Sequence, residues 1–268
     1  MSEPARIRVA IGGLTGRMGR AIASRIADSR DLTLAGGTAR AAGDVALPDG
    51  GRVSAVPVAN AAALVAGADV LIDVSSPESL ETLLHAAGDA LAGRALVVGT
   101  TGLPAAVEAA LDAQATQAAV LVAANFSVGV NLLVVLAERA ARTLDAMAFD
   151  AEILEIHHGR KVDAPSGTAL ALGRAVARGR DAVLDVHRRD GRSGTTGVRP
   201  TGEIGLHAVR GGGVVGEHRV LFLGQHERIE LAHAAHDRGL FADGALVAAR
   251  WLAGKPPGRY TMTQVLGL

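Results

Sequence analysis

Short apolar segments alternate with helical patterns through the first half of the chain. Residues 7–11 read Ile-Arg-Val-Ala-Ile, an alternation typical of a β-strand. A glycine-rich stretch over residues 13–19 follows, and apolar residues then recur at helical spacing to about Asp28. This order predicts a strand, a tight turn and a helix.

The same alternation continues to about residue 127. Asn60 is placed to cap a helix that Gly67 ends, Ser76-Pro77-Glu78 is a typical helix start, and Pro104 opens another helix. The expected strands are residues 32–36, 70–74, 95–99 and 120–122. Repeated strand–helix units predict an α/β fold with a Rossmann-like, doubly wound parallel sheet that binds ligands at the carboxyl ends of its strands.

The second half has a different pattern. A helix is expected from Asn131 to about Leu144, and residues 149–158 alternate as a strand. Residues 179–202 are polar and glycine-bearing and predict a mobile loop, and β-hairpins are expected from Gly205 onward, with residues 219–223 pairing with 228–234. A last helix is expected over residues 241–252.

These patterns predict three parts. Residues 1–127 form the dinucleotide-binding domain, residues 128–238 form an α+β substrate-binding and oligomerisation domain with a mixed, largely antiparallel sheet, and residues 239–268 pack back on the first domain.

Composition narrows the possible functions. Among 268 residues 49% are apolar and 2% aromatic, so the core consists mainly of aliphatic side chains. The 27 basic and 27 acidic residues balance, which gives no electrostatic footprint for nucleic acid. The absence of cysteine excludes disulfides and thiolate catalysis.

No targeting or membrane segment is expected. The N-terminal apolar run is broken too early for a secretory signal. Residues 118–137 are uncharged and long enough to span a bilayer, but Asn125, Ser127 and Asn131 favour a strand, a loop and a buried helix. We therefore expect a cytoplasmic protein.

The glycines at positions 13, 16 and 19 suit a dinucleotide pyrophosphate, because glycine allows close approach and the helix start supplies N–H groups. The alternative is a turn without a ligand. No acidic residue follows the second strand; Ala39 and Arg40 stand there, and Arg40 either meets a 2′-phosphate or is a solvated loop residue. The polar clusters Thr100-Thr101 and Asn125–Ser127, at two other strand ends, favour a nicotinamide pocket over plain loops.

The stretch from Glu155 to Thr168 concentrates the remaining chemistry. His157 and His158 are adjacent on a strand and should point to opposite sides, so one role for both is not expected. Lys161 follows, and Ser166 or Thr168 can cap a helix whose N–H groups at Gly167 and Thr168 suit a carboxylate. The plain alternative is a structural histidine and a simple cap. His233 and His236 have a metal-like spacing but no carboxylate pattern beside them, so no metal is expected.

Together these residues make the chain resemble the dihydrodipicolinate reductase (4-hydroxy-tetrahydrodipicolinate reductase) family over essentially its whole length. The markers are Gly16-Arg17-Met18-Gly19, Val98-Gly99-Thr100-Thr101-Gly102, the run from Ala124 to Asn131, and His157-His158 with residues 161–168. The resemblance implies reduction of 4-hydroxy-tetrahydrodipicolinate by NADPH or NADH in lysine and diaminopimelate synthesis, in a homotetramer.

The resemblance also implies site residues. His157 and Lys161 would donate protons, and His158, Gly167 and Thr168 would hold the cyclic dicarboxylate. The cofactor would contact Gly13, Leu14, Thr15, Gly16, Arg17, Met18, Gly99, Thr100, Thr101, Ala123, Ala124, Asn125 and Phe126. Members of the family often have an acidic residue where Ala39 stands, whereas Arg40 matches the position associated with NADP.

The chemistry agrees, because hydride addition to an unsaturated cyclic imine leaves electron density that needs a proton, and histidine titrates near neutrality. The rivals are another reductase of the same fold, excluding thiol-dependent enzymes, and a non-catalytic NADP sensor, which would bind the cofactor without oxidising it.

Overall fold

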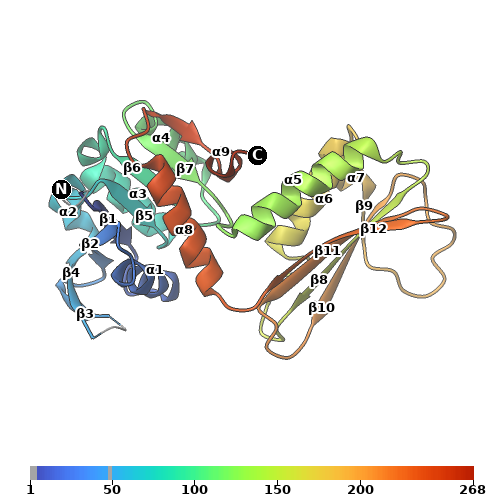
Figure 1. Ribbon diagram of the computed structural model, residues 1–268, viewed down its shortest axis with the longest axis horizontal. Helices are drawn as coiled ribbons and strands as arrows, with labels where there is room; N and C mark the ends of the chain where they lie inside the picture. Colours follow the sequence, from blue (N-terminus) through green and yellow to red (C-terminus); the bar gives the residue numbers. More distant parts are fainter. Residues whose placement is uncertain (1–4, 48–49) are drawn as a thin grey trace. The chain divides into compact units, whose positions relative to one another are not determined.

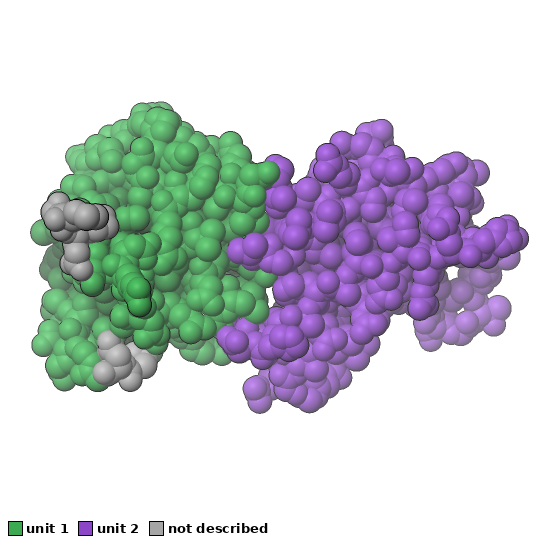
Figure 2. Space-filling model, viewed as in Figure 1, with its two compact units in different colours: residues 1–127, 239–267 green, residues 128–238, 268 purple. Residues whose placement is uncertain are grey.

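The chain returns to its first sheet at its C-terminal end, so that one structural unit is inserted into another. The structure is a computed structural model that describes residues 5–47 and 50–268. Unit 1 comprises residues 1–127 and 239–267, and unit 2 comprises residues 128–238 with the terminal Leu268 (Figure 2).

Unit 1 is built on a parallel sheet. Its strands are β1 (Ile7–Gly12), β2 (Leu32–Ala39), β3 (Gly43–Ala46), β4 (Arg52–Pro57), β5 (Val70–Asp73), β6 (Ala95–Val98), β7 (Ala119–Val122) and β13 (Gly258–Tyr260). In the described part of the chain they form one eight-stranded sheet in the order β13-β7-β6-β5-β1-β2-β4-β3, parallel except where β3 meets β4 (Figure 1). The expected Rossmann-like sheet is confirmed.

Helices cover both faces of this sheet and give it two aliphatic cores. They are α1 (Arg17–Ala27), α2 (Ala62–Ala66), α3 (Pro77–Ala87), α4 (Ala105–Gln114), α8 (Gly239–Leu252) and α9 (Met262–Leu266), with 3₁₀ turns η1 (Val58–Asn60) and η2 (Asp89–Leu91). One core joins α1, α8 and α9 to the sheet, and the other joins α2, α3 and α4. Strands buried on both faces are therefore largely apolar: β6 is apolar along its whole length, and β5 up to its last residue, Asp73.

Unit 2 pairs a sheet with two long helices. The strands are β8 (Asp150–His157), β9 (Arg188–Asp190), β10 (Ile204–Arg210), β11 (Gly216–Leu223) and β12 (Arg228–Ala235), and the helices are α5 (Val128–Thr143), α6 (Gly167–Gly179) and the short α7 (Leu184–His187). Within this fully described unit the sheet order is β12-β11-β8-β10-β9. Helices α5 and α6 pack on one face of the sheet (Figure 1).

Alternation along β8 decides which side chains face these helices. Ala151 and Ile153 are fully buried under the helices, and Glu155 and His157 follow on the same face. His218 lies opposite Glu155 on β11. The inner face therefore changes from an aliphatic core to a row of titratable groups toward the end of β8.

The structure corrects several expectations about unit 2. β10 is not part of a hairpin: it runs parallel to β8 and β9, so that two of the four pairings in this fully described unit are parallel and the sheet is mixed rather than largely antiparallel. Residues 179–202 are not a plain loop, since they contain α7 and β9. Helix α5 begins at Val128, before Asn131. The β11–β12 hairpin is confirmed.

Unit 1 also departs from expectation in places. β2 continues to Ala39, and β3, β4, β13 and α9 were not predicted. Asn60 lies in η1 and does not cap α2, whereas Ser76 caps α3 by accepting from the Ser79 N–H. In residues 5–47 and 50–268 no helix is long and apolar enough to cross a bilayer; the uncharged stretch 118–137 is divided between β7 and α5.

Candidate active site

The turn between β1 and α1 is held against β2. Gly13 has a φ of +79°, which favours glycine, and its N–H donates to Thr38 Oγ1 at 3.1 Å. The Leu14 N–H donates to the Thr38 carbonyl at 3.0 Å, and its side chain is fully buried. In the described chain no side chain caps α1 at Gly16, so the start of this helix keeps N–H groups suited to an anion.

An open hollow of about 550 Å³ adjoins this turn. It is lined by Thr15 and Gly16 on one side and by residues 39–45 on the other. Arg40 therefore shares a hollow with the glycine-rich turn, as a role in binding a dinucleotide requires. Asp44 lines the same hollow and lies 3.7 Å from Arg52.

Asp73 connects two neighbouring strand ends. Its side chain is fully buried at the end of β5, where the Thr100 hydroxyl donates to it at 2.5 Å and the Ser75 hydroxyl at 2.9 Å. Burial raises the pKa of this carboxyl. The hydrogen bonds from Thr100 and Ser75 lower it, but by less than burial raises it. A Cβ on Gly12 would lie 2.1 Å from Asp73 Oδ2, so glycine is needed there.

The predicted cofactor residues at the ends of β6 and β7 lie together. A Cβ on Gly99 would meet the Phe126 ring at 2.4 Å, so this glycine makes room for the ring. The Ala123 N–H donates to the Val98 carbonyl at 2.9 Å, and Asn125 Oδ1 accepts from the Ser127 N–H at 2.8 Å. Because β7, β6, β5 and β1 are consecutive parallel strands, these ends lie along the same edge of the sheet as the glycine-rich turn after β1, with the end of β5 between them, and such edges bind ligands.

In unit 2, His157 ends β8 and is held by Glu155. The distance from His157 Nδ1 to Glu155 Oε2 is 2.5 Å, and Glu155 is fully buried. Burial alone would raise the pKa of Glu155, but hydrogen bonds from Arg210, His157 and the Ser166 N–H outweigh it and lower the pKa. The other ring nitrogen, Nε2, would lie 3.0 Å from a Cβ on Gly216, so the missing side chain leaves space beside it.

His218 lies between the His157 ring and Ser166. Its ring is T-shaped to that of His157, with centroids 5.1 Å apart, and its Nε2 is 3.2 Å from Ser166 Oγ. Burial lowers the pKa of His218 to about 4, and the charges of His157 and Lys161 add to the effect. A neutral His218 can therefore accept the hydroxyl proton of Ser166.

Ser166 proves to be the cap of α6. Its hydroxyl accepts from the Ala169 N–H at 3.1 Å, which leaves Gly167 and Thr168 as the first two residues of the helix. Lys161 is mostly buried and donates to Asp163 at 2.8 Å. The Lys161 ammonium holds the pKa of the Asp163 carboxyl below its usual range.

His158 has partners of its own. Its N–H donates to the Val214 carbonyl at 2.8 Å, and Arg238 donates to its Nε2 at 3.1 Å. Partial desolvation, followed by the charge of Arg238, lowers the pKa of His158. The two adjacent histidines thus have different partners, as the strand alternation predicts.

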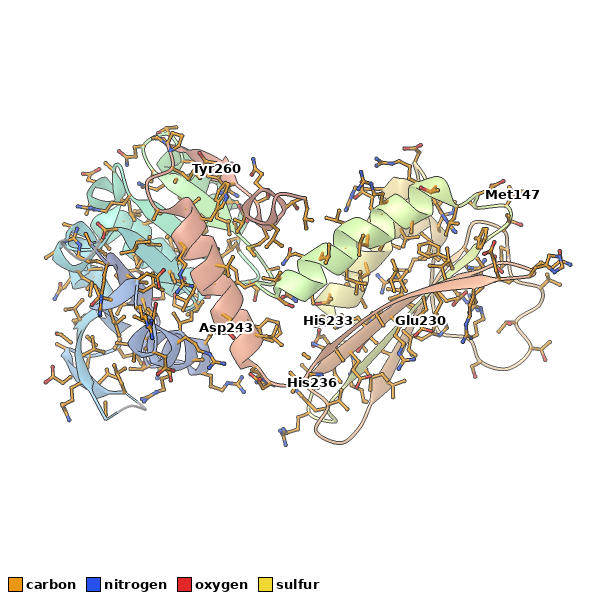
Figure 3. All side chains as sticks on the ribbon, viewed as in Figure 1. Met147, Glu230, His233, His236, Asp243 and Tyr260 are labelled. Atoms are coloured by element: carbon orange, nitrogen blue, oxygen red, sulfur yellow. The ribbon has the colours of Figure 1, made fainter. Side chains whose placement is uncertain are left out.

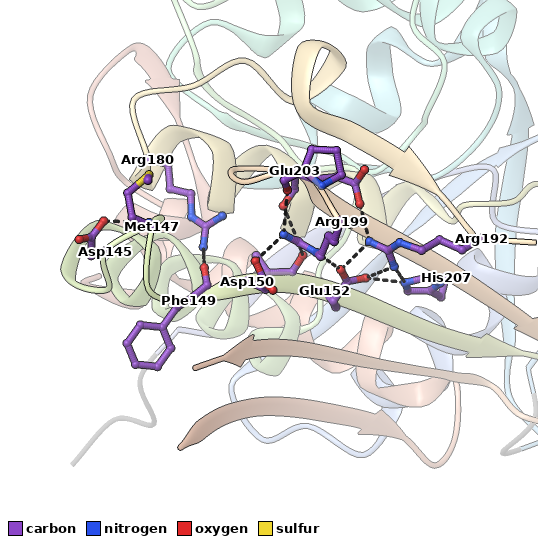
Figure 4. Close-up of polar contacts among 12 residues, drawn as sticks. Asp145, Met147, Phe149, Asp150, Glu152, Arg180, Arg192, Arg199, Glu203 and His207 are labelled. Atoms are coloured by element: carbon purple, nitrogen blue, oxygen red, sulfur yellow. Dashed lines mark hydrogen bonds and ion pairs between the residues drawn. The ribbon is translucent and has the colours of Figure 1, made fainter. Parts of the chain in front are cut away.

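A second cluster of Glu, His and Arg lies on the opposite face of β8. Glu152 accepts from Arg192 at 2.8 Å, from Arg199 at 2.9 Å and from His207 at 2.6 Å (Figure 4). A Cβ on Gly205 would collide with this carboxylate, so Glu152 lies across Gly205. This cluster ties residues 192–203 to the sheet and is separate from the His157 site.

Among residues 5–47 and 50–268 no group of three or more His, Asp or Glu side chains is placed to hold a metal ion. His233 lies on β12 and His236 just beyond its end (Figure 3).

Asp73, Arg210 and His218 were not predicted as site residues, and Glu155 was not given a role. Asp73 directly ends an apolar strand, and Glu155 shares the strand face of His157; both signals are in the sequence. Arg210 and His218 are separated from His157 by more than fifty positions, and only the sheet register brings them together.

Comparison with known proteins gives consistent results. The model of the dihydrodipicolinate reductase N-terminus matches residues 7–126, and that of its C-terminus matches residues 129–266. The chain is 45% identical to the 4-hydroxy-tetrahydrodipicolinate reductase of Rhodopseudomonas palustris (strain BisB5), over 98% of both chains. It is 47% identical to that of Acidiphilium cryptum, over 98% of this chain and 99% of the relative.

Among solved structures, the fold resembles a dipicolinate-bound dihydrodipicolinate reductase from Paenisporosarcina sp. TG-14. The TM-score is 0.71 at 24% identity, with 97% of this chain and 98% of that chain covered. The DAP dehydrogenase of C. glutamicum, solved in complex with DAP, is a more distant match with a TM-score of 0.54 at 16% identity, over 98% and 96% of the two chains.

Proposed function

The chain belongs to the dihydrodipicolinate reductase family and is an NAD(P)H-dependent reductase of lysine and diaminopimelate synthesis, and we propose that His157 and Lys161 supply its protons. The observation that carries this proposal is the way in which the His157 ring is held. Its Nδ1 is held by a buried carboxylate while Gly216 leaves space beside Nε2. A ring held in this way can hand over a proton from one defined atom.

The substrate is 4-hydroxy-tetrahydrodipicolinate. Dehydration of the substrate removes its hydroxyl group, which gains a proton and leaves as water. The ring loses one proton in the same step. NADPH or NADH, when bound, supplies a hydride to the unsaturated ring. One further proton then completes the reduction, and we assign it to His157 Nε2 or Lys161 Nζ. The Lys161 ammonium also stabilises negative charge that develops on the ring.

We place the substrate carboxylates at the start of α6. Gly167 and Thr168 are the first residues of that helix, where N–H groups and the helix dipole favour an anion. His158, supported by Arg238, is the further substrate contact. Ser166 and neutral His218 hold the cap in position.

For the dinucleotide, we propose contacts with residues 13–18, with 99–101 and with 123–126. The uncapped start of α1 and the space that Gly99 leaves for Phe126 support this choice. Leu14 can contribute through its backbone carbonyl only, since its side chain is buried and its N–H is bonded. Arg40, in the hollow beside the turn, would meet a 2′-phosphate, which favours NADPH over NADH. Because the enzyme needs one of these two reductants, we also propose that it works in the cytoplasm.

We also propose a homotetramer that is formed through the face of the unit 2 sheet opposite α5 and α6. Leu154, Ile156 and Leu221 on that face are only half-buried, and Val209 is 46% exposed. Light scattering coupled to size-exclusion chromatography should give four times the 27.2-kDa chain mass. A monomeric mass at micromolar concentration would contradict the proposal.

The catalytic assignment is tested by oxidation of NADPH, followed at about 340 nm with freshly generated substrate. His157→Ala and Lys161→Ala should each lower kcat by about 100-fold, as loss of a general acid or charge stabiliser does. His226→Ala, in the exposed β11–β12 turn, and Lys255→Ala, beside Trp251, are the matched controls. Near-normal turnover of both site variants would refute the assignment, and cofactor binding without substrate-dependent oxidation in the wild type would favour the sensor alternative.

A further inference from the structure

Glu155 is the buried carboxylate that holds Nδ1 of His157, the proposed proton donor. It lies on β8 two residues before His157 and has no exposed surface. An ionised carboxylate is costly to bury, so its retention needs a set of partners that compensates fully.

Each oxygen of Glu155 has two partners. Oε2 is 2.5 Å from His157 Nδ1 and accepts from Arg210 Nη1 at 2.8 Å. Oε1 accepts from Arg210 Nη2 at 2.7 Å and from the Ser166 N–H at 3.0 Å. One carboxylate therefore connects the proposed proton donor, an arginine of β10 and the cap of α6.

From this geometry we propose that Glu155 is a positioning residue, which makes Nε2 of His157 the nitrogen that gives up the proton and fixes the ring relative to the helix start at Ser166. The inference rests on the proposed role of His157. Because Glu155 accepts from Nδ1, the imidazolium carries its second proton on Nε2, beside Gly216. When that proton leaves, the ring remains in the neutral tautomer that still donates to Glu155.

The groups around the His157 ring support this role. From β10, Arg210 donates from both its Nη atoms to the Glu155 carboxylate. From β11, His218 presents a ring edge or face and is neutral near pH 7, because burial lowers its pKa to about 4. From the following loop, Lys161 is paired with Asp163. The Glu155 carboxylate is thus the anion in direct contact with the ring.

Glutamine cannot replace this carboxylate without conflict. Both oxygens accept from Arg210, so an amide in either orientation sets its NH₂ against a guanidinium N–H. An NH₂ facing His157 would moreover require Nδ1 to accept, which leaves the ring neutral with its proton on Nε2 and disfavours the imidazolium that acts as the acid. Replacing the orienting aspartate of a Ser-His-Asp triad by its amide disturbs the histidine tautomer in the same way.

The test is the pH dependence of kcat in Glu155→Gln, Glu155→Asp and the control Glu152→Gln. Glu152 is matched to Glu155 because it lies on the same strand with two arginines and a histidine as partners, but on the other face. We expect Glu155→Gln to lower kcat by about 100-fold. The fall of its rate at high pH should begin at a lower pH, because protonated His157 loses its anionic partner. Glu155→Asp keeps the charge and should restore most of the rate, and Glu152→Gln should leave the shape of the profile unchanged.

A double variant separates positioning from a purely structural role. If Glu155 acts through His157, adding Glu155→Gln to His157→Ala should lower kcat by less than about threefold more, since the two residues work as a unit. Multiplicative losses, or equal losses in Glu155→Gln and Glu152→Gln with unchanged profiles, would overturn the inference. Should Glu155→Gln fail to fold, Glu155→Asp decides alone: because it keeps the charge, a loss of kcat near about 100-fold in this variant would count against the positioning role.

Failure of the proposed function is a different result. It would appear as a wild-type protein without substrate-dependent NADPH oxidation, or as normal turnover in His157→Ala. The inference fails by itself if those two proteins behave as proposed and Glu155→Gln retains the wild-type rate and pH profile.

Discussion

Glu152 should make the stability of unit 2 depend on acidity, and its replacement by glutamine measures how much. Its side chain is 11% exposed and accepts from Arg192, Arg199 and His207. Burial alone would raise the pKa of Glu152, but the hydrogen bonds from Arg192, His207 and Arg199 lower it from 4.5 to about 2. Glutamine imitates the protonated carboxyl, so Glu152→Gln removes the ionised state without removing the side chain.

The size of the effect follows from this pKa. A tenfold change in proton affinity, which is one pKa unit, corresponds to about 1.4 kcal/mol. The fall in the pKa of Glu152 from 4.5 to about 2 therefore means that the ionised side chain contributes about 3 kcal/mol to the free energy of unfolding at pH 7. Because the folded-state pKa is the lower one, this stability is complete above about pH 5 and is lost as the pH falls toward 2. At pH 3 about 2 kcal/mol of it has gone, since the unfolded chain is then largely protonated and the folded chain is not.

The measurement is hydrogen exchange of peptides from β8 and β10, comparing wild type and Glu152→Gln at the same pH so that intrinsic rates cancel. The free-energy cost of the substitution should be about 2 kcal/mol larger at pH 7 than at pH 3, or about 30-fold in exchange rate. Glu227→Gln is the control, because Glu227 is exposed in the β11–β12 turn of the same unit and should cost below about 0.5 kcal/mol at both pH values. Equal costs of Glu152→Gln at both pH values would refute the reasoning.

Three further substitutions probe the two sites. Arg40→Ala should raise the Kd for NADPH by about 10- to 100-fold, as loss of a charge-assisted contact does, and change that for NADH little; titration by fluorescence measures both, and equal changes would return Arg40 to a solvated loop role. Gly216→Ala adds a methyl group 3.0 Å from His157 Nε2 and should lower kcat at least about tenfold with the dinucleotide Kd unchanged; wild-type kcat would show that Nε2 does not meet the substrate. Asp73→Ala leaves the buried Thr100 hydroxyl without its acceptor and should cost about 1–3 kcal/mol in urea unfolding, whereas an unchanged midpoint would mean that the hydroxyl finds another partner.

Much of unit 1 could be predicted because its local and global signals agree. The buried strands β6 and β7 are uninterrupted apolar runs. A helix start such as Ser76-Pro77-Glu78 combines a cap, a fixed φ and a first-turn acid. The short strand β3 is the mostly exposed edge of the sheet, and β4 beside it has a single fully buried residue, Ala55, so no apolar run marks either strand. Asn60 is a good cap by type, but the chain is already turning in η1 there and the signal misleads.

In unit 2 the strands could be predicted but not their pairing. β10 has the alternation of a hairpin strand, yet it pairs in parallel with β8 and not with β11, the next strand in the chain. β8 lies between the two, because residues 211–215 carry the chain past β8 before β11 begins. The polarity of residues 191–203 suggested mobility because their partner, Glu152, lies some forty positions earlier. For the same reason the His157 and Lys161 motif could be found in the sequence, whereas Arg210 and His218 depend on a register that only the folded sheet defines.

The return of the chain to its first sheet has a consequence for synthesis. Helix α8 contributes Ala242, Ala245, Ala249 and Leu252 to a core whose other members include Val9 and Ile72. A ribosome therefore releases the first 127 residues long before the helix that covers them exists, and the inserted unit can complete its own core in the meantime. Unit 1 can thus complete this core only after unit 2 has been synthesised, and until then the face of its sheet that α8 covers is open to aggregation.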